Sequence, residues 1–220
     1  MLPAATLFVA VCTQRDFWPG GATPLVDAVT AANVAALFAL AGRLRIREGG
    51  IWCQHAPAVQ AQASPPAAHP SAAGLAPHCL VASPGADVAA GCTPALPLAT
   101  IAATVAPSMV APVLDRGHAY YVGSGCGAAV DADPVHARVF DHLTAGVGDA
   151  VVFGAGVEYG VACAVDALLR RRVRTHVALD AAAAVDDADA QAVIADWKRR
   201  GVDGATVATL ARLLARGSQP

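Results

Sequence analysis

The stretch Thr6-Leu-Phe-Val-Ala-Val-Cys-Thr-Gln-Arg-Asp-Phe-Trp-Pro-Gly-Gly21 decides the fold of this chain. Its first half is an apolar run, and its second half is a polar turn that closes on Pro-Gly-Gly. The apolar run predicts a buried strand over residues 7–11. Functional groups in open α/β folds gather at the carboxyl ends of the strands, so the polar turn is the first candidate site.

Strand patterns and helical patterns alternate along the rest of the chain. Further strands are expected within residues 43–52, 118–122, 150–153 and 173–179, and helices over 25–41, 134–145, 159–171 and 189–200. Asp133 and Pro134 have the residue types of a helix N-cap and first position. A last short strand containing Val207 is expected before a final helix over 210–215. This alternation predicts one three-layer α/β/α domain over residues 1–220, with a mainly parallel sheet.

Residues 56–77 stand apart because they contain five prolines among Ala, Ser and Gln. Proline cannot sit in a regular helix interior or a central strand. The segment is therefore predicted to be a long loop, and long loops inside compact domains are often functional.

The composition excludes several classes of protein. The 220 residues are 55% hydrophobic and 15% charged, which suits a large buried core rather than a disordered chain. A net charge of -2 gives no electrostatic case for binding nucleic acid or an anionic membrane. Since no run approaches the ~20 apolar residues that span a bilayer, no membrane partner is expected. A small-molecule ligand or substrate is the expected partner, and homo-oligomer formation stays open.

The six cysteines are scattered and include no Cys-x-x-Cys pair. This pattern favours thiols over a disulfide framework, and thiols are typical of a cytoplasmic protein.

Four sequence blocks, in order, resemble the nicotinamidase/isochorismatase-like cysteine hydrolases, and the nicotinamidase-like subgroup in particular. The blocks are Gln14-Arg-Asp-Phe-Trp-Pro-Gly-Gly21, then Cys53-Gln-His55 with Ala76-Pro-His-Cys-Leu-Val-Ala-Ser-Pro-Gly-Ala86, then Tyr121-Val-Gly-Ser124, and Val151-Val-Phe-Gly-Ala-Gly-Val-Glu-Tyr-Gly-Val161. The resemblance implies the three-layer fold of that family. It also implies hydrolysis of an amide or a related bond by a cysteine thiolate, with an Asp as proton acceptor and a Lys assisting.

The resemblance also shows where this chain departs from the family. Cys12 stands at the Asp position, Ser124 at the Lys position and Gly160 at the nucleophile position. Because glycine has no side chain, the covalent route cannot start there. We therefore expect loss of standard nicotinamidase activity, as in a pseudoenzyme. The alternative is an active metal-assisted hydrolase of a small amide such as nicotinamide, or of a related carbonyl compound, with a non-standard nucleophile.

Several residues around these positions are candidates for a rebuilt site. Cys163, three residues after Gly160, could act as a relocated thiol, or it could be a small buried hydrophobic residue. The resemblance implies an oxyanion hole at the amides of Gly156 and Gly160, beside a cis-peptide position at residues 155–156. It also implies that the turn lines the pocket, which makes Asp16, Phe17 and Trp18 the substrate-binding candidates, although Asp16 could instead bond nearby backbone amides. His136 and His142 are alternative bases, but solvated positions on a helix face are expected for both.

The resemblance implies a metal site as well. Family members hold a divalent metal with an Asp-x-His pair and a later His, and the matching residues here are Cys53, His55 and His78. One Cys and two His are good zinc ligands, and they leave a fourth position for a ligand or water. The alternative is a vestigial site in which the three side chains have only structural roles.

Overall fold

The computed structural model describes residues 5–55, 75–102, 106–124 and 129–217. Its centre is a seven-stranded sheet with the strand order β3-β4-β2-β1-β5-β6-β7, in which every neighbouring pair is parallel. The strands are β1 (Thr6–Val11), β2 (Arg47–Cys53), β3 (Leu98–Ala102), β4 (Ala119–Ser124), β5 (Asp149–Ala155), β6 (Arg174–Ala183) and β7 (Asp203–Ala205). The predicted mainly parallel sheet is confirmed.

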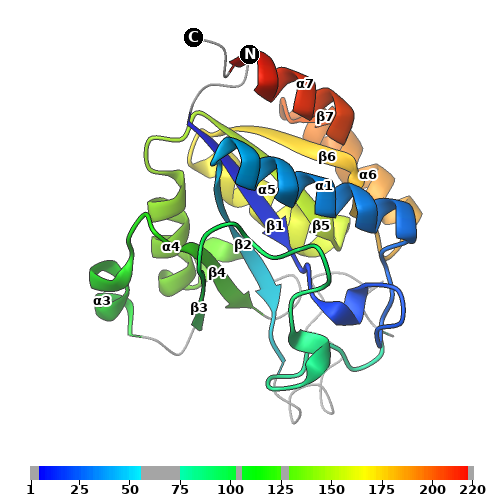
Figure 1. Ribbon diagram of the computed structural model, residues 1–220, viewed down its shortest axis with the longest axis horizontal. Coiled ribbons are helices and arrows are strands. Elements are labelled where there is room, and N and C mark those ends of the chain that lie inside the picture. The colour runs from blue at the N-terminus through cyan, green and yellow to red at the C-terminus, as the bar shows by residue number, and fades with distance from the viewer. Residues whose placement is uncertain (1–4, 56–74, 103–105, 125–128, 218–220) are drawn as a thin grey trace.

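Helices cover both faces of this sheet, as Figure 1 shows. The longer ones are α1 (Ala28–Leu44), α4 (Pro134–Thr144), α5 (Ala162–Arg170), α6 (Asp187–Arg199) and α7 (Val207–Gly217). Shorter segments are α3 (Pro107–Val110), η1 (Arg15–Phe17), η3 (Pro84–Ala86), η4 (Ala111–Val113), η5 (Val130–Ala132) and the π-helical η6 (Val157–Val161). The predicted three-layer α/β/α architecture is therefore confirmed. In the described residues, no helix has both the length and the apolar character that a membrane crossing requires.

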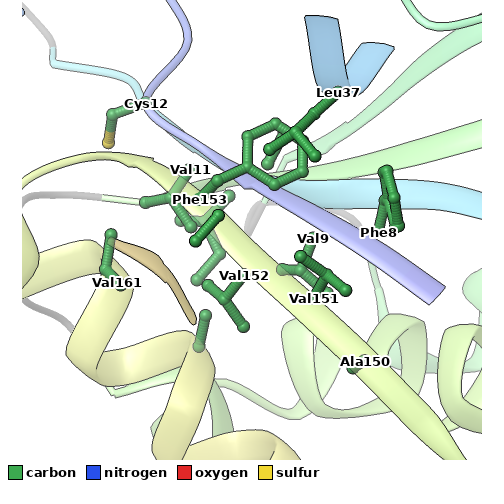
Figure 2. Packing of buried hydrophobic residues seen from close by; sticks show 14 of the residues in the cluster. Phe8, Val9, Val11, Cys12, Leu37, Ala150, Val151, Val152, Phe153 and Val161 are labelled. Carbon is green, nitrogen blue, oxygen red and sulfur yellow. The ribbon is translucent and has the colours of Figure 1, made fainter. Parts of the chain in front are cut away.

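Alternation along the central strands explains how two helical layers share one sheet. Phe8 and Phe153 project to one face, where the ring of Phe153 meets that of Phe38 on α1 at a centroid distance of 5.5 Å. Val9 and Val11 point to the opposite face. Both β1 and β5 are buried along their whole length, because each is central in the sheet and covered on both faces. Figure 2 shows this packing, with Cys12 just beyond the end of β1.

Helix α4 begins as the sequence predicts. The Asp133 carboxylate accepts hydrogen bonds from the amides of Val135 and His136, at 2.8 and 3.1 Å, and Pro134 is the first helical residue. These contacts satisfy amide groups that have no partner within the helix.

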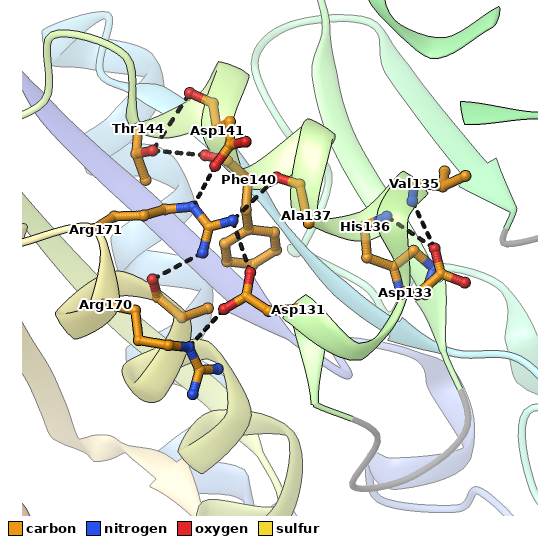
Figure 3. Close-up of polar contacts among 11 residues, drawn as sticks. Asp131, Asp133, Val135, His136, Ala137, Phe140, Asp141, Thr144, Arg170 and Arg171 are labelled. Carbon is orange, nitrogen blue, oxygen red and sulfur yellow. Dashed lines mark hydrogen bonds and ion pairs between the residues drawn. The ribbon is translucent and has the colours of Figure 1, made fainter. Parts of the chain in front are cut away.

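The side chain of Arg171 ties three elements together (Figure 3). Its guanidinium lies 2.7 Å from the Asp131 carboxylate in η5 and donates to Asp141 of α4 at 2.8 Å. It also donates to the carbonyl oxygens of Ala137 and Ala167. Arg171 therefore fixes α4 and η5 against the end of α5.

Two predictions about the elements need correction, and one strand was missed. Val207 does not belong to a strand: the last strand is Asp203–Ala205, and Val207 begins α7, where its amide donates to the Asp180 carboxylate. Strand β3 was not predicted, because its sequence Leu-Ala-Thr-Ile-Ala lies in an Ala- and Pro-rich region without clear alternation. The helix expected from residue 159 starts as η6 and becomes α-helical only at Ala162. The predicted loop over 56–77 lies outside the described residues, except for residues 75–77.

Candidate functional site

The carboxyl ends of β1, β2 and β4 meet at one edge of the sheet because all strands run in the same direction. Cys12 directly follows β1, Cys53 is the last residue of β2, and Ser124 ends β4 in register with Cys53. Parallel topology thus brings two predicted triad positions and one predicted metal ligand together at the edge where α/β proteins bind their ligands.

Cys12 adopts an unusual backbone conformation at this edge. Its φ is 48°, in the left-handed region, and its amide donates to the carbonyl oxygen of Ile51 at 2.8 Å. Such a conformation costs a non-glycine residue about 1–3 kcal/mol and persists only where the surroundings impose it. Its buried Sγ atom lies 3.3 Å from Sγ of Cys53.

Gly160 lies beside Cys12, as the resemblance implies for the nucleophile and acid positions. A Cβ atom built on Gly160 would be 3.6 Å from the Cys12 Sγ atom and 2.6 Å from Cγ1 of Val11. The position is therefore oriented toward the site but has no nucleophilic atom to offer, so a covalent intermediate on residue 160 is excluded.

The amide of Gly156 is already engaged. Its N–H donates to the carbonyl oxygen of Ala183 at 2.8 Å, and its φ is 78°. The described residues contain no cis peptide bond, so the peptide between Ala155 and Gly156 is trans. An oxyanion hole at Gly156 and Gly160 stays a prediction, and it requires Gly156 to give up its bond to β6.

Cys163 lies partly buried near the same edge, but its protonation state does not favour nucleophilic chemistry. Burial, together with the charges of Asp166 and Cys12, raises the pKa of its thiol to about 11, despite the opposing effect of Arg170. Since the thiolate is the nucleophile, a raised pKa weakens the case for Cys163 as a relocated catalytic group.

Cys53, His55 and His78 form a compact cluster of metal-ligating side chains. One potential ligand atom of each lies within 4.8 Å of the others, with Cys53 and His78 buried and His55 partly buried. The three residues that the resemblance implies as metal ligands are thus brought together. One thiolate and two imidazoles suit a borderline-soft divalent ion such as Zn²⁺, so the donor set fits that metal.

Backbone contacts hold the two histidines in place. His55 pairs with Leu80 in an isolated parallel bridge, in which the His55 amide donates to the Cys79 carbonyl at 3.1 Å and the Val81 amide donates to His55. The Nδ1 atom of His78 lies 2.8 Å from the carbonyl oxygen of Ala76. A proton on Nδ1 satisfies this contact and leaves the lone pair of Nε2 for a metal.

Gln14 is a site residue whose role the sequence did not reveal. Its fully buried side chain accepts a bond from the Cys53 amide and donates to the Cys53 carbonyl oxygen, both at 2.8 Å. It also donates to the carbonyl oxygen of Ala86 at 3.1 Å. The amide side chain therefore continues the sheet beside β2 and fixes the backbone of a metal-ligand candidate. The available signal was a polar residue three positions after the end of a buried strand.

The three predicted substrate-binding residues have different surroundings. The Asp16 carboxylate accepts bonds from the amides of Cys79 and Ala22, which is the structural role weighed for it. Phe17 is buried and its ring centroid lies 5.0 Å from that of His78, so it lines the metal-ligand cluster. Trp18 is also buried, and its indole N–H has no hydrogen-bond partner among the described residues.

His136 differs from its expected solvated position. It is buried in the first turn of α4, and its Nε2 atom has no hydrogen-bond partner within the described part of the chain. Burial lowers its pKa, despite opposing effects of Asp133 and the backbone of Gly123. His142 is partly buried, and its Nε2 atom lies 2.9 Å from the carbonyl oxygen of Asp115.

Comparisons with known proteins place this geometry in a fold. No family model and no curated protein matches the chain. Among solved structures, an isochorismatase family protein from Desulfovibrio vulgaris has a TM-score of 0.66 and 19% identity, over 96% of this chain and 99% of that one. The chain has the isochorismatase-like hydrolase fold.

Two further structures with this isochorismatase-like fold carry informative descriptions. A pyrazinamidase of Pyrococcus horikoshii in complex with zinc has a TM-score of 0.60 and 17% identity, over 92% of this chain and 99% of that one. The YcaC protein of Escherichia coli, described as an octameric hydrolase of unknown specificity, has a TM-score of 0.61 and 14% identity, over 98% and 82%.

Proposed function

We propose that this chain is a zinc-binding relative of the nicotinamidase and isochorismatase hydrolases that has lost the covalent cysteine route. The observation that carries the proposal is the combination of Gly160 beside Cys12 with the cluster of Cys53, His55 and His78. The edge of the sheet keeps a metal-ligand set while the nucleophile position has no side chain. In this view the protein binds a small molecule at the metal and does not turn over nicotinamide.

The chain's own residues explain how a ligand would be held there. Gln14 fixes the backbone of Cys53, the Ala76 carbonyl orients His78, and Phe17 supplies an aromatic wall next to His78. A small aromatic or heterocyclic ligand with one metal-binding atom fits such a setting, because stacking and a single metal bond together fix its orientation. Zinc, when bound, would supply a Lewis acid for that atom.

Metal-assisted hydrolysis of a small amide is the second candidate function. The size of the metal-ligand cluster favours it. Zinc is usually four-coordinate, so three protein ligands would leave one coordination position for water or substrate, as in catalytic rather than structural zinc sites. The two candidates share the metal and differ in turnover.

Metal content tests the shared part. Tag-free protein is expected to contain about one zinc per chain by elemental analysis, and the double variant Cys53→Ala/His55→Ala is expected to contain almost none. The matched control Cys92→Ala/His118→Ala removes the same two residue types outside the cluster and should keep its zinc. Equal zinc in both double variants would overturn the assigned site.

Turnover separates the two candidates. The zinc-loaded protein is incubated with nicotinamide and a panel of small amides, and release of ammonia is followed. We expect no release above that of the Cys53→Ala/His55→Ala variant. Ammonia release that requires the cluster would establish the metal-assisted hydrolase instead.

A homo-oligomeric state and a cytoplasmic location are part of the proposal. The octameric description of YcaC supports a homo-oligomer here as well, which light scattering on the purified protein would test. The five cysteines among the described residues are thiols, and this fits the predicted cytoplasmic location.

A further inference from the structure

We propose that Cys12 and Cys53 form a reversible disulfide bond that withdraws Cys53 from the metal-ligand cluster. Cys12 directly follows β1 and Cys53 ends the neighbouring parallel strand β2, and their buried Sγ atoms lie 3.3 Å apart. The pair therefore links the position of the missing catalytic acid to the proposed metal site.

The geometry brings the two sulfur atoms close to bonding distance. A disulfide has an S–S length of about 2.05 Å, so the sulfur atoms must approach by roughly 1.3 Å. The Cys12 amide donates to the carbonyl oxygen of Ile51 at 2.8 Å, which holds the backbone at Cys12 close to the end of β2. The left-handed conformation at Cys12 directs its side chain toward the end of β2, and at residue 160 there is no side chain to obstruct the Cys12 sulfur, which would lie 3.6 Å from a Cβ atom there.

Cys92 and Cys163 are less suited to this reaction. Burial raises the pKa of Cys92 to about 12, and the Cys92 Sγ atom contacts the backbone oxygen of Ala90 at 3.8 Å. Cys163 is the rival partner for Cys12, because the charge of Cys12 contributes to its raised pKa. No sulfur contact comparable to that between Cys12 and Cys53 links Cys163 to another described cysteine.

The oxidant required is a hydroperoxide. One thiolate attacks a peroxide oxygen, the O–O bond breaks, and the products are a sulfenic acid and, after proton uptake, water or an alcohol. The second thiol then attacks the sulfenic sulfur, the S–S bond forms, and water leaves. Overall, two thiols are oxidised to one disulfide, and hydrogen peroxide is reduced to two molecules of water.

Oxidation and metal binding would compete for the same sulfur atom. A sulfur in a disulfide has no thiolate to give to a metal, and a sulfur bound to zinc is protected from peroxide. Formation of the bond does not depend on the proposed function, whereas its effect on zinc does. The chain would thus hold metal in a reducing medium and release it under peroxide stress.

The test uses the full chain after zinc removal by a chelator. The protein is treated with hydrogen peroxide and digested without reduction after aromatic residues and leucines. Cleavage at Trp52 and Leu75 separates Cys53 from both Cys79 and Cys92. We expect a cross-linked pair of peptides containing Cys12 and Cys53, which dithiothreitol separates. Cys163→Ala and Cys92→Ala proteins should give the same product, and Cys12→Ser should not.

The products and the effect of zinc decide between the possibilities. A cross-link from Cys12 to Cys163, or sulfinic acid at Cys12 or Cys53 without any cross-link, would overturn the proposal. Zinc-loaded protein should form the Cys12–Cys53 cross-link at least tenfold more slowly than zinc-free protein. If the cross-link forms but the protein never binds zinc, the disulfide stands and the proposed metal function fails. If zinc binds at the cluster but no cross-link forms in the zinc-free protein, the proposed metal function stands and the disulfide proposal fails.

Discussion

Gly160 lies directly against Val11, so that a Cβ atom on residue 160 would come within 2.6 Å of the valine Cγ1 atom. Val11 is fully buried at the end of β1. The valine therefore already occupies space that any side chain at residue 160 would need. The conformation of Gly160 is not the constraint, because its φ is not positive. The packing of the core thus disfavours any side chain at residue 160.

Gly160→Ala is expected to lower the free energy of unfolding by about 1–3 kcal/mol, because overpacking a tight core forces its neighbours to shift. Urea denaturation measures the effect. In a double-mutant cycle with Val11→Ala, the smaller alanine at residue 11 should make room for the new Cβ atom. Gly160→Ala should then destabilise the fold less, which gives a favourable coupling energy. Simple additivity of the two changes would show that Val11 is not the obstacle.

Replacing Gln14 by Ala is expected to lower the free energy of unfolding by about 2–4 kcal/mol. The change leaves the buried amide and carbonyl groups of Cys53 without their partner, and an unsatisfied buried polar group costs about 1–3 kcal/mol. Zinc affinity should fall as well, because the ligand backbone loses its support. Thermal unfolding and zinc titration are the measurements. The exposed Gln191→Ala variant is the control, and an equal effect in both variants would rule out a positioning role for Gln14.

The buried carboxyl group of Glu48 should make the folded state less stable as the pH rises. Its carboxyl is buried, and burial raises its pKa from 4.5 to about 7, although the Ala95 amide bond acts in the opposite direction. Because the pKa of Glu48 is higher in the folded state than in the unfolded state, protonation of Glu48 stabilises the fold. This stabilisation is complete below the pKa of the unfolded state, 4.5, and is lost as the pH rises through 7. The loss between pH 4.5 and pH 7 is about 3 kcal/mol at most.

The variant Glu48→Gln removes the ionisation while it keeps the size and the acceptor for the Ala95 amide. Urea denaturation at pH 5 and pH 8 compares the two proteins. The variant should gain stability relative to the original chain as pH rises. A difference between them that does not change with pH would show that Glu48 does not titrate in this range.

Arg171→Lys is expected to lower the free energy of unfolding by about 1–2 kcal/mol. A lysine cannot reproduce the forked contacts with Asp131, Asp141 and two carbonyl oxygens. Chemical denaturation of this variant beside the exposed Arg199→Lys provides the comparison. Equal stability of the two variants would contradict a linking role for Arg171.

Much of the scaffold was predictable because its signals are local. The buried strand before the Pro-Gly-Gly turn and the Asp133 cap depend on neighbouring residues, and both predictions are confirmed. Strand β3 escaped because an Ala-rich edge strand has no distinctive pattern. Val207 was expected in a last short strand, but its amide donates to the Asp180 carboxylate and it begins helix α7, a long-range contact that the local sequence does not encode.

The clustering of the three predicted metal ligands was predictable, but the contacts around them were not. The resemblance supplied Cys53, His55 and His78, and the structure gathers them. The contact between Cys12 and Cys53 depends on strand order and on the left-handed conformation at Cys12, which no local pattern encodes. The burial of His136 likewise depends on how α4 packs against β4, so helical periodicity alone left it on the solvated face.

The two hydrogen bonds between the Gln14 side chain and the backbone of residue 53 have a consequence for how such sites evolve. Gln14 binds only main-chain atoms of that residue, so the backbone stays fixed whichever side chain the position carries. The side chain at residue 53 can therefore be exchanged between an oxygen donor and a sulfur donor without a change in the surrounding backbone. If residue 53 binds the proposed metal, a carboxylate there would favour harder cations and a thiolate softer ones, so a single substitution would change the metal preference without changing the fold.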